Sequence, residues 1–116
     1  DVDDSELNKE LAHQVNVEGL RNLIQLSEVK THIIQISSDY VFDGSNGPYS
    51  EDDHTFPVNY YGKTKLEGER AMQAIRPMNS IIIRTSWVYS EFGNNFYKSS
   101  LTLLFDFFVV WRTTVR

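Results

Sequence analysis

The chain has 116 residues, of which 41% are hydrophobic and 13% aromatic, and this is enough for the packed core of about one domain. Its formal net charge of -5 argues against a surface that follows nucleic-acid phosphates, so we expect no nucleic-acid partner. These residues include no cysteine, which excludes from them a disulfide framework and a thiolate zinc site. The three histidines are too scattered to suggest a metal cluster, and we predict no metal site.

The two ends of the chain bear on membrane targeting. The chain opens on acidic residues and shows neither the basic nor the apolar region of a signal peptide. Near the other end, Leu101–Trp111 is almost wholly apolar, but this run is well short of the ~20 residues that cross a bilayer. We therefore predict a cytoplasmic protein with no membrane partner, in which this run is a buried strand or helix.

The first predicted element is a helix over residues 6–29. Apolar residues recur there every three to five positions, as they do on one face of a helix. They are Leu7, Leu11, Val15, Leu20, Leu23 and Ile24. We expect Asp4 or Ser5 to cap the start of this helix.

Two short, β-branched apolar runs, at 32–37 and 81–85, predict buried parallel strands. A second helix is predicted between them over 60–75, with Pro57 just before its start and Pro77 closing it. The order helix, strand, loop, helix, strand implies right-handed crossovers. It predicts an α/β fold with a doubly wound parallel sheet and helices on both faces.

A long loop over 38–59 separates the first strand from the second helix. It contains Asp-Gly, Asn-Gly-Pro and a further proline, and it is far longer than ordinary connections. The loop leaves the carboxyl end of the first strand, which is the edge where open α/β sheets bind ligands. We therefore expect a functional site at this edge.

Three side chains near this edge have the chemistry of a proton-transfer site. Tyr61 and Lys65 are four residues apart on one helix face, and Ser38 follows the first strand. A free phenol has a pKa of about 10, and a nearby ammonium would lower that of Tyr61 toward the range useful for catalysis. The Ser38 hydroxyl would polarise a carbonyl oxygen. In the structural alternative, Tyr61 packs at the helix start and Lys65 pairs with Glu69 on a solvated face.

Four motifs occur together and in order along the chain. They are SSDYVFDG at 37–44, PY at 48–49, PVNYYGKTKLEGE at 57–69 and RTSWVY at 84–89. In combination they resemble the dTDP-4-dehydrorhamnose reductases, a family of the extended short-chain dehydrogenases/reductases. The resemblance covers most of the chain.

The resemblance implies an enzyme that reduces the 4-keto group of dTDP-4-dehydro-L-rhamnose to dTDP-L-rhamnose with NADPH or NADH, in nucleotide-sugar and polysaccharide biosynthesis. Tyr61 would protonate the developing alkoxide, and Lys65 would lower its pKa and hydrogen-bond the nicotinamide ribose. Ser38 takes the place of a threonine common in the family and keeps its hydroxyl. Ile36 falls at a cofactor-binding position.

Further positions match the family residue by residue. Asp39, Tyr40 and Trp87 fall where relatives contact the nucleotide-sugar. Asn16 matches the asparagine that supports the active-site lysine through water in many relatives. Structural alternatives remain: Asp39 could organise the turn after Ser38, Trp87 could be core, and Asn16 could be a satisfied polar residue.

The chain also departs from the family pattern. No Gly-x-Gly-x-x-Gly occurs in it, although relatives use that turn to cradle the cofactor pyrophosphate at a helix N-terminus. We therefore expect residues 1–100 to be the central part of an NAD(P)-binding Rossmann-like domain that lacks the N-terminal Gly-rich β-α unit. Residues 101–116 form an apolar tail atypical of the family, as a truncation or frameshift would produce. The fragment alone is expected to be inactive.

Two other functions stay open. A homologous family of regulatory subunits of methionine adenosyltransferase shares VFDG at 41–44 and YGKTK at 61–65, although its members tend to carry asparagine at the position of Asp39. A nucleotide-sugar epimerase or dehydratase of the same superfamily is disfavoured, because those relatives usually read Tyr-Gly where VFDG stands. The resemblance also implies a dTDP-linked 4-keto sugar as partner and a homodimer, with Mg²⁺ at the dimer interface in some relatives.

Overall fold

The structure is a computed structural model that describes residues 2–86 and the backbone of 112–114. In chain order the elements are α1 Val2–Leu7, α2 Lys9–His13, the π-helical turn η1 Gln14–Glu18, α3 Gly19–Leu26, β1 Ile33–Ser38, the 3-10 turn η2 Asp39–Val41, α4 Tyr60–Ile75, β2 Ser80–Thr85 and β3 Arg112–Thr114. The predicted site residue Trp87 lies outside the described residues, and so do all residues of the predicted tail except 112–114.

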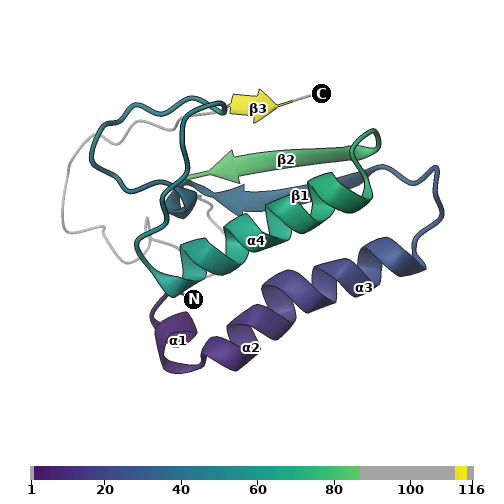
Figure 1. Cartoon of the computed structure of the whole chain (residues 1–116), viewed down its shortest axis with the longest axis horizontal. Helices are drawn as coiled ribbons and strands as arrows, with labels where there is room; N and C mark the ends of the chain where they lie inside the picture. The colour runs from purple at the N-terminus through teal and green to yellow at the C-terminus, as the bar shows by residue number, and fades with distance from the viewer. Residues whose placement is uncertain (1, 87–111, 115–116) are drawn as a thin grey trace, which may run out of the picture.

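The sheet has the strand order β1-β2-β3 (Figure 1). β1 and β2 are parallel, and β3 is antiparallel to β2. Ser38 pairs with Thr85 in the register of β1 and β2, so both strands end at the same edge. The predicted α/β class and its two parallel strands are therefore confirmed.

The four α-helices labelled in Figure 1 lie on one side of this sheet. The burial of β1 agrees, because Ile33, Gln35 and Ser37 are buried whereas the alternate residues Ile34 and Ile36 are 58% and 55% exposed. One covered face is thus seen in the described part of the chain, and the predicted helices on a second face stay a prediction.

Two small clusters of buried side chains form the core. Ile24 of α3, Ile33 of β1 and Met72 of α4 form the first, which joins both helices to the sheet. The second consists of Val41, Phe42 and Leu66, with Tyr49 packed against it. This second cluster anchors the long loop on α4, immediately beside the carboxyl edge of the sheet.

The first helical segment differs from its prediction. It runs from Val2 to Leu26 with interruptions, and Asn8, rather than Asp4 or Ser5, is the capping residue that accepts from the Leu11 amide. The Asn8 side chain offers the backbone a bond that competes with a continuous helix.

The predicted apolar face of this segment is mostly wrong. Leu7 is 87% exposed and Leu11, Val15 and Leu23 are also exposed. Of the predicted residues, Ile24 is buried and Leu20 packs partly buried against the first cluster, whereas the other buried apolar side chains, Ala12 and Val17, were not predicted. Small Ala12 permits close packing, and the π-helical turn inserts extra backbone per turn, which changes the face presented to α4.

The second helix, α4, has the predicted bounds Tyr60–Ile75. The Asn59 side chain caps its start by accepting from the Gly62 amide at 2.7 Å. At its end, Arg76 donates to the carbonyls of Ile24, Ser27 and Glu28 at 2.7–3.1 Å. The last turn of α3 is therefore completed by a side chain that follows α4.

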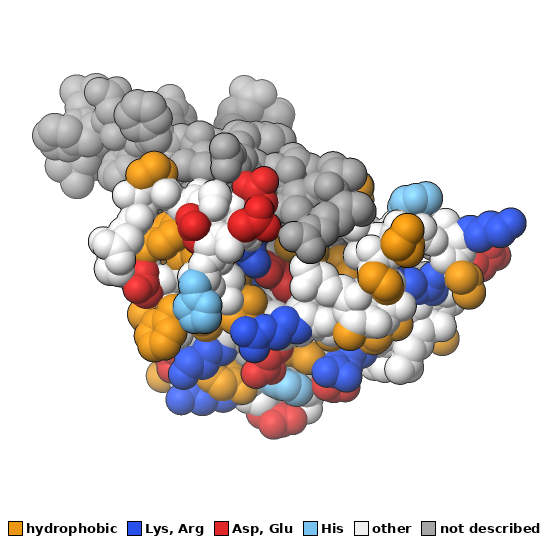
Figure 2. Space-filling model, turned by 45° about the horizontal axis from the view of Figure 1, so that its top comes forward, with side chains coloured by type: hydrophobic (Ala, Val, Ile, Leu, Met, Phe, Trp, Pro, Cys, Tyr) orange, Lys and Arg blue, Asp and Glu red, His pale blue; other side chains and the backbone are white. Residues whose placement is uncertain are grey.

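Apolar side chains also remain on the surface. Figure 2 shows one face on which apolar, acidic and basic side chains are interspersed over the described part of the molecule. Among the described residues, no helix combines the length and the apolar character that crossing a membrane requires.

Candidate active site

Ser38 is the last residue of β1, and its hydroxyl organises the turn that follows. The buried Ser38 Oγ donates to the Asp39 carboxylate at 3.1 Å and accepts from the Tyr40 amide at 3.2 Å. These bonds fix the hydroxyl at the end of the strand and start η2. The structural role considered for Asp39, that of organising this turn, is therefore present in the geometry.

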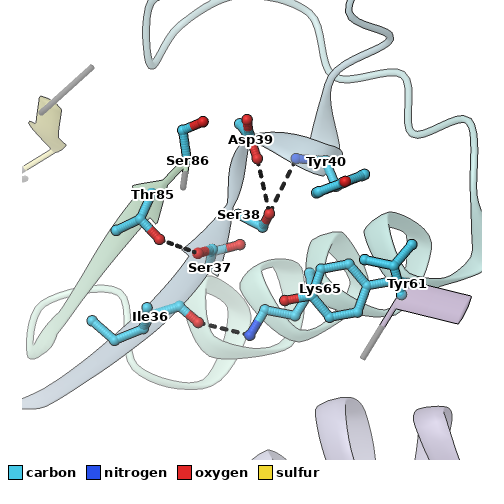
Figure 3. Close-up of a pocket in the computed structure, with 10 residues that line it drawn as sticks. Ile36, Ser37, Ser38, Asp39, Tyr40, Tyr61, Lys65, Thr85 and Ser86 are labelled. Carbon is cyan, nitrogen blue, oxygen red and sulfur yellow. Dashed lines mark hydrogen bonds between the residues drawn. The ribbon is translucent and has the colours of Figure 1, made fainter. Parts of the chain in front are cut away.

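Tyr61 and Lys65 extend from α4 toward the same strand end (Figure 3). The Tyr61 ring meets the Tyr40 ring edge to face, with centroids 5.8 Å apart and an interplanar angle of 85°. The Lys65 ammonium donates to the Ile36 carbonyl at 2.7 Å. Side chains from a strand, a turn and a helix thus meet at one point.

The pKa of Tyr61 differs from the prediction in its direction. Burial raises this pKa above 10.0, and the Asp39 carboxylate and the Tyr40 phenol raise it further, while a hydrogen bond with Ser38 opposes the rise. The net direction is therefore opposite to the predicted one, and the lowering of this pKa by Lys65 itself stays a prediction. The ammonium is engaged with the Ile36 carbonyl, and the charge that acts on the phenol is the negative one on Asp39.

Lys65 is itself perturbed by its surroundings. Burial lowers the pKa of its ammonium from 10.5, and the Glu69 carboxylate raises it in part. Glu69 is 2% exposed and bonds to Arg84 at 2.7 Å, so the alternative in which Lys65 pairs with Glu69 on a solvated face is also wrong.

One pocket of about 600 Å³ joins these groups. The predicted site residues among its lining are Ile36, Ser38, Asp39, Tyr40, Tyr61 and Lys65. Four further residues, Val2, Ser37, Thr85 and Ser86, line it without having been predicted. The common edge of two parallel strands was the signal for Thr85 and Ser86, because Thr85 ends β2 opposite Ser38 and Ser86 follows it directly.

Asn16, by contrast, is not among the described residues that line the pocket. Its side-chain amide donates to Thr64 Oγ1 at 3.0 Å, and that hydroxyl donates to the Tyr61 carbonyl at 2.9 Å. Asn16 therefore joins η1 to the first turn of α4. The water-mediated support of Lys65 remains a prediction.

The first turn of α4 approaches η2 closely. A Cβ on Gly62 would lie 2.1 Å from the Tyr40 carbonyl oxygen and 3.1 Å from a side-chain atom of Pro57. Glycine is therefore required at this position by space. The contact brings Tyr61 and Tyr40 together and so sets the position of the phenol.

The pocket has donors suited to a ligand that carries hydroxyl groups. An ammonium has three donors, and the Ile36 carbonyl takes one of those of Lys65. The Ser37 hydroxyl, which is 3% exposed as a residue, has no hydrogen-bond partner among the described groups. The two remaining donors of Lys65 fit the hydroxyl groups of a ribose. The described residues contain no group of three or more side chains suited to hold a metal ion.

Several known proteins are similar to this chain in sequence and in fold. Residues 1–108 match the family described as the RmlD substrate binding domain. A dTDP-4-dehydrorhamnose reductase from Aggregatibacter actinomycetemcomitans is 45% identical over 104 residues, which are 88% of this chain and 35% of the relative. Methionine adenosyltransferase 2 subunit beta from Bos taurus is 42% identical over 96 residues, 82% of this chain and 28% of the relative.

Solved structures agree with these matches. A dTDP-4-dehydrorhamnose reductase from Clostridium acetobutylicum superposes with a TM-score of 0.79 and 44% identity, over 86% of this chain and 36% of the other. The dTDP-4-dehydrorhamnose reductase from Bacillus anthracis, solved in complex with NADP, superposes with a TM-score of 0.80 and 36% identity, over 87% of this chain and 36% of the other. The chain spans about a third of the length of the relatives it matches. On these matches, the chain belongs to the RmlD substrate binding domain family.

Proposed function

We propose that this chain forms the proton-transfer part of an NAD(P)H-dependent dTDP-4-dehydrorhamnose reductase, which reduces the 4-keto group of dTDP-4-dehydro-L-rhamnose. The observation that carries the proposal is the meeting of Ser38, Tyr61 and Lys65 in one pocket at the carboxyl edge of the sheet. The names of the similar reductases support the substrate, and the NADP complex of one of them supports the cofactor.

Tyr61 is suited to act as the acid of this reduction. Its raised pKa keeps the phenol protonated at neutral pH, so it can give a proton to the ketone oxygen as the C–O double bond becomes an alcohol. The Ser38 hydroxyl would turn from Asp39 to donate a hydrogen bond to the same oxygen. After the transfer Tyr61 is a phenolate, and the ammonium of Lys65 stabilises that charge.

The residues that would hold the nicotinamide ribose are Tyr61 and Lys65, with Ile36 and Ser37 in the same wall of the pocket. A nicotinamide cofactor bound there would supply the hydride needed at the carbonyl carbon. Lys65 has unused donors for ribose hydroxyls while it keeps its bond to the Ile36 carbonyl. Asp39, Tyr40 and Trp87 are proposed to contact the nucleotide-sugar.

The proposal is tested by NADPH oxidation with dTDP-4-dehydro-L-rhamnose, using the full-length gene product. Tyr61→Phe keeps the ring but removes the acid, so we expect kcat to fall by about 10²–10⁴-fold. Tyr60→Phe is the matched control, because Tyr60 stands on the same turn and its ring packs under the Lys9 ammonium, 5.4 Å from the ring centroid. This control should stay within about twofold of the parent. Parental turnover by Tyr61→Phe would refute the mechanism.

A second candidate function is that of a regulatory subunit of methionine adenosyltransferase. The observation that favours it is the 42% identity with the bovine beta subunit, which is close to the identity with the reductases. Its test mixes the full-length gene product with a catalytic subunit of methionine adenosyltransferase and measures co-purification. Stable co-purification without NADPH oxidation would favour this function over the reductase.

A further inference from the structure

Arg84, near the end of β2, joins three separate parts of the chain. Its guanidinium bonds both carboxylate oxygens of Glu69, with Nη2 to Oε2 at 2.7 Å and Nε to Oε1 at 3.0 Å. Its Nη1 donates to the Glu51 carbonyl at 3.2 Å, and its Cζ lies 5.1 Å from the Phe42 ring centroid. One cation therefore contacts α4 and both ends of the loop Phe42–Glu51.

Glu69 depends on this contact. It is 2% exposed, and a carboxylate at such a site keeps its charge only when it is paired and hydrogen-bonded. Arg84 supplies that pairing with the planar fork that matches a carboxylate. Glu69 also stands one helical turn after Lys65, on the same face of α4.

The loop Phe42–Glu51 is itself an ordered unit that begins directly after η2. The Phe42 and Tyr49 rings stack with centroids 4.4 Å apart, and the Tyr49 hydroxyl donates to Asp43. Hydrogen bonds from Tyr49 and Ser45 lower the pKa of Asp43 to about 2. Arg84 thus holds a preformed loop against the helix that carries Tyr61 and Lys65.

We propose that Arg84 and Glu69 form a positioning pair for the candidate active site, in which Arg84 fastens the loop Phe42–Glu51 to α4 and holds the Glu69 carboxylate one helical turn from Lys65. Its consequence for catalysis rests on the proposed reductase function. A neutral Lys65 would stabilise the Tyr61 phenolate less and would have one donor fewer. Among the charged groups, the Glu69 carboxylate raises the pKa of Lys65, and the Asp39 carboxylate raises the pKa of Tyr61.

The first test separates the two effects of the pair in the full chain without substrate. Lys65 is titrated by amine acylation at several pH values with mass spectrometric readout, and exposed Lys63 is the internal reference. Glu69→Gln removes the charge that favours the ammonium, so Lys65 should be acylated at lower pH than in the parent, with Lys63 unchanged. An unchanged Lys65 titration would overturn its dependence on Glu69.

The second effect is measured by hydrogen–deuterium exchange of peptides from 42–51. Arg84→Lys keeps a charge opposite Glu69 but lacks the fork that also reaches the Glu51 carbonyl, so exchange there should accelerate by about tenfold. The Lys65 titration should stay near that of the parent. Arg21→Lys alters an exposed pair with Glu18, at 3.7 Å, and is the control that should change neither readout. Parental exchange in Arg84→Lys would overturn the fastening role.

A single substitution in the pair could unfold the chain because it leaves one buried charge without a partner, so a double variant that removes both charges serves as a second test. Arg84→Gln combined with Glu69→Gln removes both charges, which a buried site tolerates better than loss of one. In this double variant, peptides from 42–51 should exchange faster than in the parent, and Lys65 should be acylated at lower pH. If either readout equalled that of the parent, the proposal would be contradicted. In the full-length gene product, Glu69→Gln should raise KM for NADPH by about tenfold. Failure of only that last result would count against the reductase function, not against the pair.

Discussion

The helix α4 and the segment Val2–Leu26 pack against each other but are built on different principles. α4 is one continuous helix whose buried positions include two glycines, a threonine and a glutamate. The first segment is divided into three short helices and a π-helical turn, and leucines such as Leu7 and Leu26 are 87% and 88% exposed. The buried face of α4 thus combines apolar side chains with close approach and paired polar groups, and the candidate site lies beside it.

The largest effect that would sharpen this comparison is expected from Gly62→Ala. Alanine is favoured over glycine within a helix by about 1 kcal/mol. At this position, however, its Cβ would lie 2.1 Å from the Tyr40 carbonyl oxygen, and backbone must move to accept it. We expect the free energy of unfolding in urea to fall by about 3 kcal/mol.

Two further alanine variants give the matched controls for this prediction. In the first segment, a Cβ on Gly19 would lie 3.3 Å from the Gln14 carbonyl oxygen, so Gly19→Ala should cost less than about 1 kcal/mol. Lys63→Ala, at the exposed position next to Gly62, should change stability by less than about 0.5 kcal/mol. If Gly62→Ala were as stable as the parent, helix propensity rather than close approach would govern α4.

The second effect concerns the place where α4 supports the first segment. Arg76→Met removes charge-assisted hydrogen bonds to the Ile24, Ser27 and Glu28 carbonyls, which have lost their helical partners at the end of α3. We expect a loss of about 2 kcal/mol in urea unfolding, with hydrogen exchange of peptides from 20–30 accelerating more than that of α4. Arg70→Met, on the exposed face of α4, should leave both unchanged; equal losses in the two variants would contradict the capping role.

The regular elements of this fold could be read from the sequence. The β-branched runs predicted both strands to within one residue, and periodicity with flanking prolines predicted α4 at Tyr60–Ile75. The meeting of Ser38 with Tyr61 and Lys65 was also predictable, because helix periodicity and the common edge of parallel strands determine it.

Features that depend on distances in three dimensions could not be read in this way. Arg84 and Glu69 are 15 positions apart in the sequence. The one signal for their pairing was a charged residue, Arg84, within an otherwise apolar strand, because such a residue needs a partner when it is buried. The direction of the pKa shift of Tyr61 required the burial of the ring and the nearness of Asp39. In the first segment, leucine spacing misled because the π-helical turn changes which side faces α4.

The third effect compares the two asparagine caps. The Asn59 side chain accepts from the Gly62 amide at 2.7 Å in a partly buried position, whereas Asn8 accepts from the Leu11 amide at 3.3 Å in an exposed one. Asn59→Ala should therefore cost about 1 kcal/mol in urea unfolding, and Asn8→Ala about 0.5 kcal/mol. Asn59→Asp should retain most of the stability because it keeps the acceptor. A larger cost for Asn8→Ala would mean that the start of α2 supports more of the fold than its exposure indicates.

The smallest effect is expected from the exposed leucines. Leu26→Gln replaces a side chain that is 88% exposed, so the free energy of unfolding should change by less than about 0.5 kcal/mol. Leu66→Gln, at a buried position of α4, is the contrasting variant and should cost several times more, because it places an unpaired amide beside Val41 and Phe42. If Leu26→Gln instead cost more than about 1 kcal/mol, that leucine would be covered in solution, and the first segment would rely on apolar burial as the leucine spacing had predicted.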